Sequence, residues 1–141
     1  MSDVEVLQVS WQGMEPHLRD IRTKVFIEEQ NVPEDLEWEE ADHNAVHLLV
    51  KTAGHYVATA RLLNTGQIGR MAVLKPYRLL GVGSAMLVKL LSIAEKNNMQ
   101  SVILNAQLDA MAFYKKQGFK VESDVFDDAG IPHRKMSKSL I

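Results

Sequence analysis

At residues 67–84 the sequence reads Gln67-Ile68-Gly69-Arg70-Met71-Ala72-Val73-Leu74-Lys75-Pro76-Tyr77-Arg78-Leu79-Leu80-Gly81-Val82-Gly83-Ser84. The apolar first part predicts a β-strand over residues 67–74, which the proline ends. Gly81 and Gly83 precede apolar residues at helical spacing, so a helix is expected after them. A short loop before a helix directs unpaired backbone N–H groups at one point, and Arg78 adds positive charge. The junction is therefore a candidate anion site, although a lone G-x-G is equally compatible with a tight turn.

Strands and helices are expected on both sides of this junction. Apolar alternation and helical spacing predict strands near residues 4–9, 45–52, 56–63, 101–105, 121–126 and 135–140, and helices over residues 14–27, 82–98 and 110–117. Ala53-Gly54 is a hairpin signal, and Gly118 is expected to end the last helix. The acidic segment 28–42 shows no clean period and is interpreted as a loop or short helix beside a groove. This order predicts an α+β fold with a mixed, mostly antiparallel sheet and helices on both faces.

Composition restricts the class of protein. A chain of 141 residues, 24% charged and 46% hydrophobic, is typical of a folded protein, and we expect residues 1–141 to form a single domain. A net charge of −2 provides no positive field for nucleic acid. The absence of cysteine excludes disulfides, thiolate metal sites and a cysteine nucleophile. With neither a signal peptide nor a long apolar run, we expect a cytoplasmic monomer or homodimer with no nucleic acid or membrane partner.

Other phosphate-binding motifs fit poorly. The pattern G-x-x-x-x-G-K-[ST] of nucleotide hydrolases occurs nowhere in the chain. A dinucleotide fingerprint requires a third glycine where Met86 stands and an acid at the end of the next strand, where Asn105 stands. The predicted hairpins are also foreign to that fold.

Two motifs in order point to one family. Residues 67–84 resemble the acetyl-CoA motif of the GCN5-related N-acetyltransferase (GNAT) superfamily, whose loop reads [QR]-x-x-G-x-[GA]. Residues 113–119, Phe-Tyr-Lys-Lys-Gln-Gly-Phe, resemble the family's F-Y-x-x-x-G-F element, which follows a central strand ending at Asn105. Residues 25–33 and 129–133 are similar to the V-F-x-x-E-Q-x-V-P and A-G-I-P-H elements of a small bacterial acyltransferase subgroup. A more distant similarity is to glyphosate N-acetyltransferases.

The resemblance implies a fold and a cosubstrate. The implied sheet has six or seven strands and is splayed in the middle, with the pantetheine arm of acetyl-CoA in the opening. Free backbone groups of the splayed strand would pair with the pantetheine amides, and an N–H near Met71 or Ala72 would polarise the thioester carbonyl. The cofactor-binding residues expected on this basis are Met71, Ala72, Val73, Arg78, Leu79, Leu80, Gly81, Val82, Gly83, Ser84, Asn105 and Tyr114.

Two residues suit the proton transfers of acetylation. Tyr114 occupies the position of the family's tyrosine proton donor, and a phenol can protonate a leaving thiolate. His133 matches the histidine proposed as base in the glyphosate-acetylating relatives, and imidazoles titrate near neutral pH. The alternatives are a tyrosine that anchors the cofactor by packing and a loop histidine at a strand end. Many superfamily members have a glutamate base on the strand before the loop, whereas this chain has Gly69 and Arg70, so we assign the base to His133 or to water.

The acceptor site is the least determined part. Arg22 and Arg70 are candidates for an acceptor carboxylate or phosphonate, because guanidinium binds such groups through two hydrogen bonds. Pairing with the acids of residues 28–40 is the alternative for Arg22. Gln30 and Gln107 are further candidates for the pocket wall.

No metal is expected. His43 and His47 are four residues apart, but on a predicted strand that spacing separates them by roughly 13 Å. The leading function is direct acetyl transfer from acetyl-CoA to a small amine in a ternary complex. The alternative is a module that binds acyl-CoA without catalysis, which would use the same cofactor residues.

Overall fold

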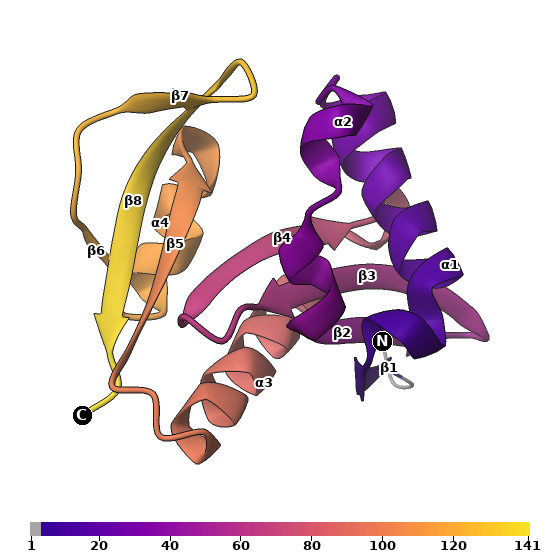
Figure 1. Cartoon of the computed structure of the whole chain (residues 1–141), viewed down its shortest axis with the longest axis horizontal. Coiled ribbons are helices and arrows are strands. Elements are labelled where there is room, and N and C mark those ends of the chain that lie inside the picture. Colours follow the sequence, from indigo (N-terminus) through magenta and orange to yellow (C-terminus); the bar gives the residue numbers. More distant parts are fainter. Residues whose placement is uncertain (1–3) are drawn as a thin grey trace.

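An eight-stranded sheet forms the centre of the molecule in the computed structural model, which describes residues 4–141 (Figure 1). The neighbour order is β1-β2-β3-β4-β5-β8-β6, and β7 pairs with β8. The strands are β1 (Val4–Val9), β2 (Val46–Thr52), β3 (His55–Leu62), β4 (Gln67–Val73), β5 (Ser101–Gln107), β6 (Lys120–Val121), β7 (Phe126–Asp128) and β8 (Ile131–Ser139). The helices are α1 (Trp11–Arg22), α2 (Glu34–Glu37), α3 (Val82–Lys96) and α4 (Met111–Lys116), with a π-helix η1 (Thr23–Glu29) and 3₁₀ turns η2 (Glu40–Asn44), η3 (Lys75–Tyr77) and η4 (Leu108–Ala110).

The sheet divides between β4 and β5. β4 and β5 form the one parallel strand pair among the described residues, and their pairing consists of Gln67 opposite Ile103 and Ile68 opposite Leu104. Beyond these two positions the strands diverge, and Figure 1 shows β1 to β4 on one side of the division and β5 to β8 on the other. The expected splayed, mostly antiparallel α+β fold is therefore confirmed.

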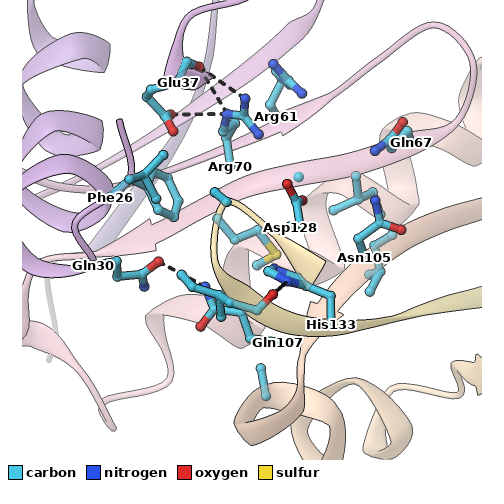
Figure 2. Close-up of a pocket in the computed structure, with 18 of the residues that line it drawn as sticks. Phe26, Gln30, Glu37, Arg61, Gln67, Arg70, Asn105, Gln107, Asp128 and His133 are labelled. Atoms are coloured by element: carbon cyan, nitrogen blue, oxygen red, sulfur yellow. Dashed lines mark hydrogen bonds and ion pairs between the residues drawn. The ribbon is translucent and has the colours of Figure 1, made fainter. Parts of the chain in front are cut away.

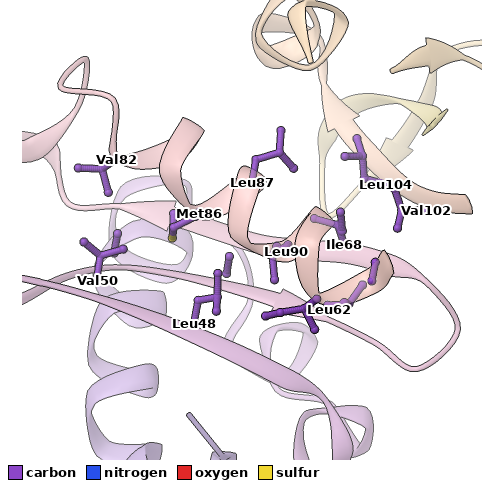
Figure 3. Packing of buried hydrophobic residues seen from close by; sticks show 14 of the residues in the cluster. Leu48, Val50, Leu62, Ile68, Val82, Met86, Leu87, Leu90, Val102 and Leu104 are labelled. Carbon is purple, nitrogen blue, oxygen red and sulfur yellow. The ribbon is translucent and has the colours of Figure 1, made fainter. Parts of the chain in front are cut away.

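Helices cover both faces of the sheet because each strand directs apolar side chains to both faces. Leu48 and Val50 of β2 lie in the core cluster that contains the α3 residues Met86 and Leu90 (Figure 3). Leu49, between them, lies in the other cluster, with residues of α1. Successive strand side chains point to opposite faces, so one apolar run fills two cores.

Two boundaries differ from those expected. The first helix begins at Trp11 rather than after Gly13, because the Ser10 side chain caps it by accepting the Gly13 N–H at 3.0 Å. The expected strand 121–126 is two short strands, which adds one strand to the expected number. Ser123 interrupts it: its hydroxyl accepts the Lys135 N–H and its carbonyl accepts Arg134 Nε–H, so side chains replace ladder bonds.

Three local predictions agree with the structure. Ala53 and Gly54 have φ of 50° and 80°, as the turn between β2 and β3 requires. Gly118, with φ of 93°, follows the end of α4 as expected. The long helix after the glycine-rich loop is α3, which begins at Val82. No helix within residues 4–141 is long and apolar enough to cross a membrane.

Candidate active site

A cavity of about 240 Å³ lies where β4 and β5 diverge (Figure 2). Its wall is built from β3, β4, β5, α2, α4, the end of η1 and the β7–β8 hairpin. These sequence-predicted residues line it: Gln30, Arg70, Met71, Asn105, Gln107, Tyr114 and His133. Residues that are distant in the sequence thus meet at the split in the sheet.

His133 lies on a strand, not in the loop that was considered for it. The hairpin turn falls at Ala129 and Gly130, both with positive φ, so β8 has already begun at Ile131. His133 is 8% exposed and is opposite Gln107 of β5 and Phe126 of β7, whose ring stacks on the imidazole. Its Nδ1 lies 2.6 Å from the Ile131 carbonyl oxygen. A carbonyl can only accept, so Nδ1 carries a proton, and the neutral form of the ring has its lone pair on Nε2.

Tyr114 reaches the cavity from α4. Its hydroxyl donates to the thioether sulfur of Met71 at 3.4 Å, across the division of the sheet. Burial raises the pKa of the Tyr114 phenol to about 12. The phenol therefore keeps its proton throughout the physiological pH range and is positioned to donate to sulfur.

Arg70 occupies a bulge in β4. Two β4 residues, Arg70 and Met71, stand opposite the single β3 residue Ala60, and Arg70 has φ of 49°. Such a bulge redirects side chains and interrupts ladder bonds, and positive φ in a non-glycine residue marks local strain. The Arg70 guanidinium contacts the Glu37 carboxylate at 3.1 Å and the Glu39 carboxylate at 2.9 Å.

Arg22 does not line the cavity, and its expected role in acceptor binding is wrong. The side chain is wholly buried and forms ion pairs with Glu37 at 2.7 Å and Asp42 at 2.8 Å. A further N–H group is bound by the Glu37 carbonyl. Burial would raise the pKa of the Asp42 carboxyl, but the hydrogen bond and charge of Arg22 hold it well below its ordinary value. Arg22 therefore has a structural role, which was the alternative considered for it.

The glutamine pair spans the cavity wall. Gln107 Nε2 donates to Gln30 Oε1 at 2.9 Å, which links β5 to the segment after η1 (Figure 2). Asn105, also on β5, lines the same cavity. These amides provide polar groups without net charge.

Three charged lining residues were missed by sequence reasoning: Arg61, Glu37 and Asp128. Arg61 is the one residue of β3 among Asp, Glu, Lys and Arg, and that isolated charge was the available signal. Glu37 lies in the acidic segment, where no period separates buried acids from exposed ones. Asp128 reaches the cavity only because the β7–β8 hairpin folds back.

The loop at residues 78–84 lies outside this cavity. The first backbone bond of α3 runs from Ala85 N–H to the Gly81 carbonyl, so the N–H groups of residues 82–84 have no acceptor within the helix. Leu79 and Leu80 are exposed, and Leu79 and Gly81 have positive φ. A Cβ added to Gly83 would lie 3.6 Å from Phe113 of α4, so the two sequence motifs meet across the division.

Arg78 connects this loop to the split in the sheet. Its Nε donates to the Val73 carbonyl at 2.8 Å, and its two terminal nitrogens donate to the Glu29 carboxylate at 2.6 and 2.7 Å. The hydrogen bond from Arg78 lowers the pKa of the Glu29 carboxyl. The side chain of Ala72, beside Val73, is buried in the cluster that contains residues of α1. Only the backbone of Ala72 is therefore available to contact a cofactor.

Within residues 4–141 no group of three or more His, Asp or Glu side chains is placed to hold a metal ion. His47 lies on β2 and its Nε2 is 2.8 Å from the Asp42 carbonyl oxygen, whereas His43 belongs to η2.

Comparisons with known proteins agree with this geometry. The family model for acetyltransferase (GNAT) domains matches residues 6–140. The uncharacterized N-acetyltransferase YjcF of Bacillus subtilis is 38% identical over 131 residues, which is 88% of this chain and 94% of that protein. An acyl-CoA N-acyltransferase from Pseudomonas aeruginosa superposes with a TM-score of 0.87 at 27% identity, over 97% of this chain and 100% of that one. Escherichia coli ElaA superposes with a TM-score of 0.86 at 27% identity, over 96% and 99%.

Proposed function

The chain belongs to the GNAT acetyltransferase family, and from that membership we propose that it transfers an acetyl group from acetyl-CoA to a small amine, directly and in a ternary complex. One observation carries the proposal. His133 and Tyr114 both line the cavity at the split in the sheet, the first with Nδ1 bound to the Ile131 carbonyl and the second with a hydroxyl that donates to sulfur. Acetylation of an amine needs one group of each kind.

The donor half of the site follows from the open edge of β4 and the start of α3. Pantetheine amides would pair with backbone groups of Met71 to Val73, where the edge of β4 that faces β5 has no partner strand among the described residues. The diphosphate would lie on the N–H groups of residues 82–84, where the helix dipole favours an anion. Arg78, anchored to the Val73 carbonyl, adds a cation between these two parts.

The reaction forms a C–N bond and breaks the C–S bond of the thioester. The attacking nitrogen loses a proton, which His133 Nε2 accepts. Backbone N–H groups at the β4 bulge would stabilise the oxyanion, and the thiolate leaves with a hydrogen bond from Tyr114. Because a thiol ordinarily titrates near pH 8.5, well below the phenol pKa of about 12, Tyr114 stabilises the thiolate mainly as a hydrogen-bond donor.

An amine screen tests this proposal. Free thiol release from acetyl-CoA is measured with a panel of small amines, and the acetylated product is identified by mass. We expect turnover with some amines, and a loss of about 10² to 10⁴ in kcat/KM for His133→Gln, the range for general bases. The matched control is His55→Gln, on β3 and outside the cavity. Acetyl-CoA binding without turnover would instead indicate a module that only binds acyl-CoA.

A further inference from the structure

Arg61 is a buried cation in the cavity wall with no part in the chemistry described above. It lies on β3, and its side chain is 3% exposed. Its Nη1 contacts Asp42 Oδ1 at 2.9 Å and Glu39 Oε1 at 2.9 Å. Its buried Nε has no hydrogen-bond partner within residues 4–141, and no bond from its Nη2 to those residues is found.

The unpartnered atoms form one edge of the guanidinium. Nε and Nη2 lie side by side, and this edge matches the two oxygens of a carboxylate. Gly69 leaves space beside the Nη2 end of this edge, since a Cβ added there would lie 3.9 Å from Nη2. Buried N–H groups are nearly always hydrogen-bonded in folded proteins, so an unsatisfied one in a cavity wall points to a ligand.

The other two buried N–H groups without a hydrogen-bond partner do not indicate a ligand in this cavity. Among the described residues, the indole N–H groups of Trp11 and Trp38 are also buried without a partner, but neither residue lines the cavity. Both indole rings instead face the guanidinium of Arg22. Arg61 alone of the three faces the ligand space.

The remaining charges complete a two-ended site. The Glu37 carboxylate forms ion pairs with Arg22 and Arg70. Because these pairs balance its charge, Glu37 would not repel an anion bound near Arg61. Asp128 lines the cavity and has no ion pair within residues 4–141. Figure 2 shows Arg61 and Arg70 at one end of the cavity and His133 at the other, with Asp128 between them in that view. One end of the site therefore presents guanidinium N–H donors whose charges are balanced by Glu37, Glu39 and Asp42, and an acid and a base lie toward the other end.

We propose that the acceptor is a small amino carboxylate, bound through its carboxylate to the Nε and Nη2 edge of Arg61. Its amine extends toward Asp128 and His133. The proposal rests on the acetyltransferase function proposed above and specifies its substrate class. The cavity of about 240 Å³ is below the roughly 300–1,000 Å³ typical of sites for drug-sized ligands, so the acceptor is small.

The test compares matched acceptors in the native protein and in Arg61→Lys. The panel is glycine, 4-aminobutyrate and 6-aminohexanoate, each with its amide and with methylamine, propylamine or pentylamine as the decarboxylated partner. We expect kcat/KM for at least one carboxylate to exceed that of both partners by about tenfold or more. Arg61→Lys keeps the charge beside Asp42 but removes the fork, so this ratio should fall toward one. Comparing each compound in both proteins cancels differences in intrinsic amine reactivity.

Two further variants guard against a folding defect. Gly69→Ala retains Arg61 and places a methyl group beside Nη2, so it should reduce the same ratio. Arg134→Lys is the matched control, because this arginine lies on β8, outside the cavity, and should leave the ratio unchanged. Calorimetric titration with acetyl-CoA shows whether each variant is folded and binds the donor.

The outcomes separate this inference from the proposed function. A protein that binds acetyl-CoA but prefers no carboxylate at any chain length overturns the inference. An equal preference in native protein and Arg61→Lys overturns it as well. A protein that neither binds acetyl-CoA nor acetylates any amine overturns the proposed function itself.

Discussion

Tyr114 and Met71 form a hydrogen bond across the split in the sheet. A phenol donating to a thioether at 3.4 Å already provides the donor-to-sulfur geometry that a leaving thiolate would use. The raised pKa of the phenol follows from its burial, and it has a consequence for activity. An exposed tyrosine has a pKa near 10, whereas burial raises the pKa of Tyr114 to about 12.

Replacing this tyrosine should impair catalysis without removing the donor. We expect Tyr114→Phe to lower kcat by about 10²-fold, with a much smaller change in acetyl-CoA affinity. In the native protein kcat should not fall between pH 8 and about pH 10.5, because the phenol stays protonated. Steady-state kinetics over this range checks both points, with Tyr56→Phe on β3 as the control outside the cavity. A descending limb centred near pH 10 would contradict the role given to Tyr114.

At the level of residues, sequence reasoning found much of the cavity and missed its buried charges. His133, Tyr114 and Asn105 belong to motifs with distinctive spacing, and all three line the cavity. The roles of Arg22 and Arg61 could not be assigned from the sequence, because an arginine can either pair with an acid or bind a ligand. Only the partners around each guanidinium distinguish a satisfied ion pair from a free edge, and those partners are distant in the chain.

The π-helix η1 is the element that joins the acceptor side to the cofactor loop. Its i to i+5 bonding, shown by the Gln30 N–H to Val25 carbonyl bond at 3.1 Å, is common at functional sites. One residue of helical register rotates side chains by about 100°. The register found in η1 brings Glu29 against Arg78, and Gln30, the next residue, contacts Gln107.

The Glu29 carboxylate pairs with Arg78 and would compete with the diphosphate of acetyl-CoA for this cation. We expect Glu29→Gln to tighten acetyl-CoA binding by about fivefold at low salt, because one charge near another in water is worth about 1 kcal/mol at 4 Å. The effect should shrink as salt screens the charges. Calorimetric titration at two ionic strengths measures it, and the neighbouring exposed Glu28→Gln is the control. Weaker binding by Glu29→Gln would mean that Glu29 instead holds Arg78 in its binding position.

Strands were easier to predict than the segments between them. Apolar alternation over β2, β3 and β4 is a local signal, and the hairpin at Ala53-Gly54 supplied the register. The π-helix has no such signal, because residue propensities do not distinguish i+4 from i+5 bonding. The split of the predicted strand 121–126 into β6 and β7 depends on Ser123, whose bonds to β8 exist only in the folded chain.

The whole molecule consists of two parts of a sheet that separate where the donor is proposed to bind. The β4–β5 pair has two residue pairs, while β5 and β8 are paired along seven positions. Family resemblance predicted this splay, whereas alternation alone predicted only a mixed sheet. Cofactor bound in the opening would contact both parts, and a ligand that binds only the folded state adds to its stability.

Calorimetric titration of acetyl-CoA into the native protein, Gly81→Leu and Gly54→Leu tests the central claim most directly. Both glycines have φ near +80° and no atom within 4 Å of an added Cβ, so the two substitutions impose matched backbone strain. Only Gly81 lies in the proposed diphosphate loop. We predict one acetyl-CoA site per chain, retained in Gly54→Leu and strongly weakened in Gly81→Leu. Absence of binding to the native protein, or equal affinity in the two variants, would contradict a coenzyme A site at this loop.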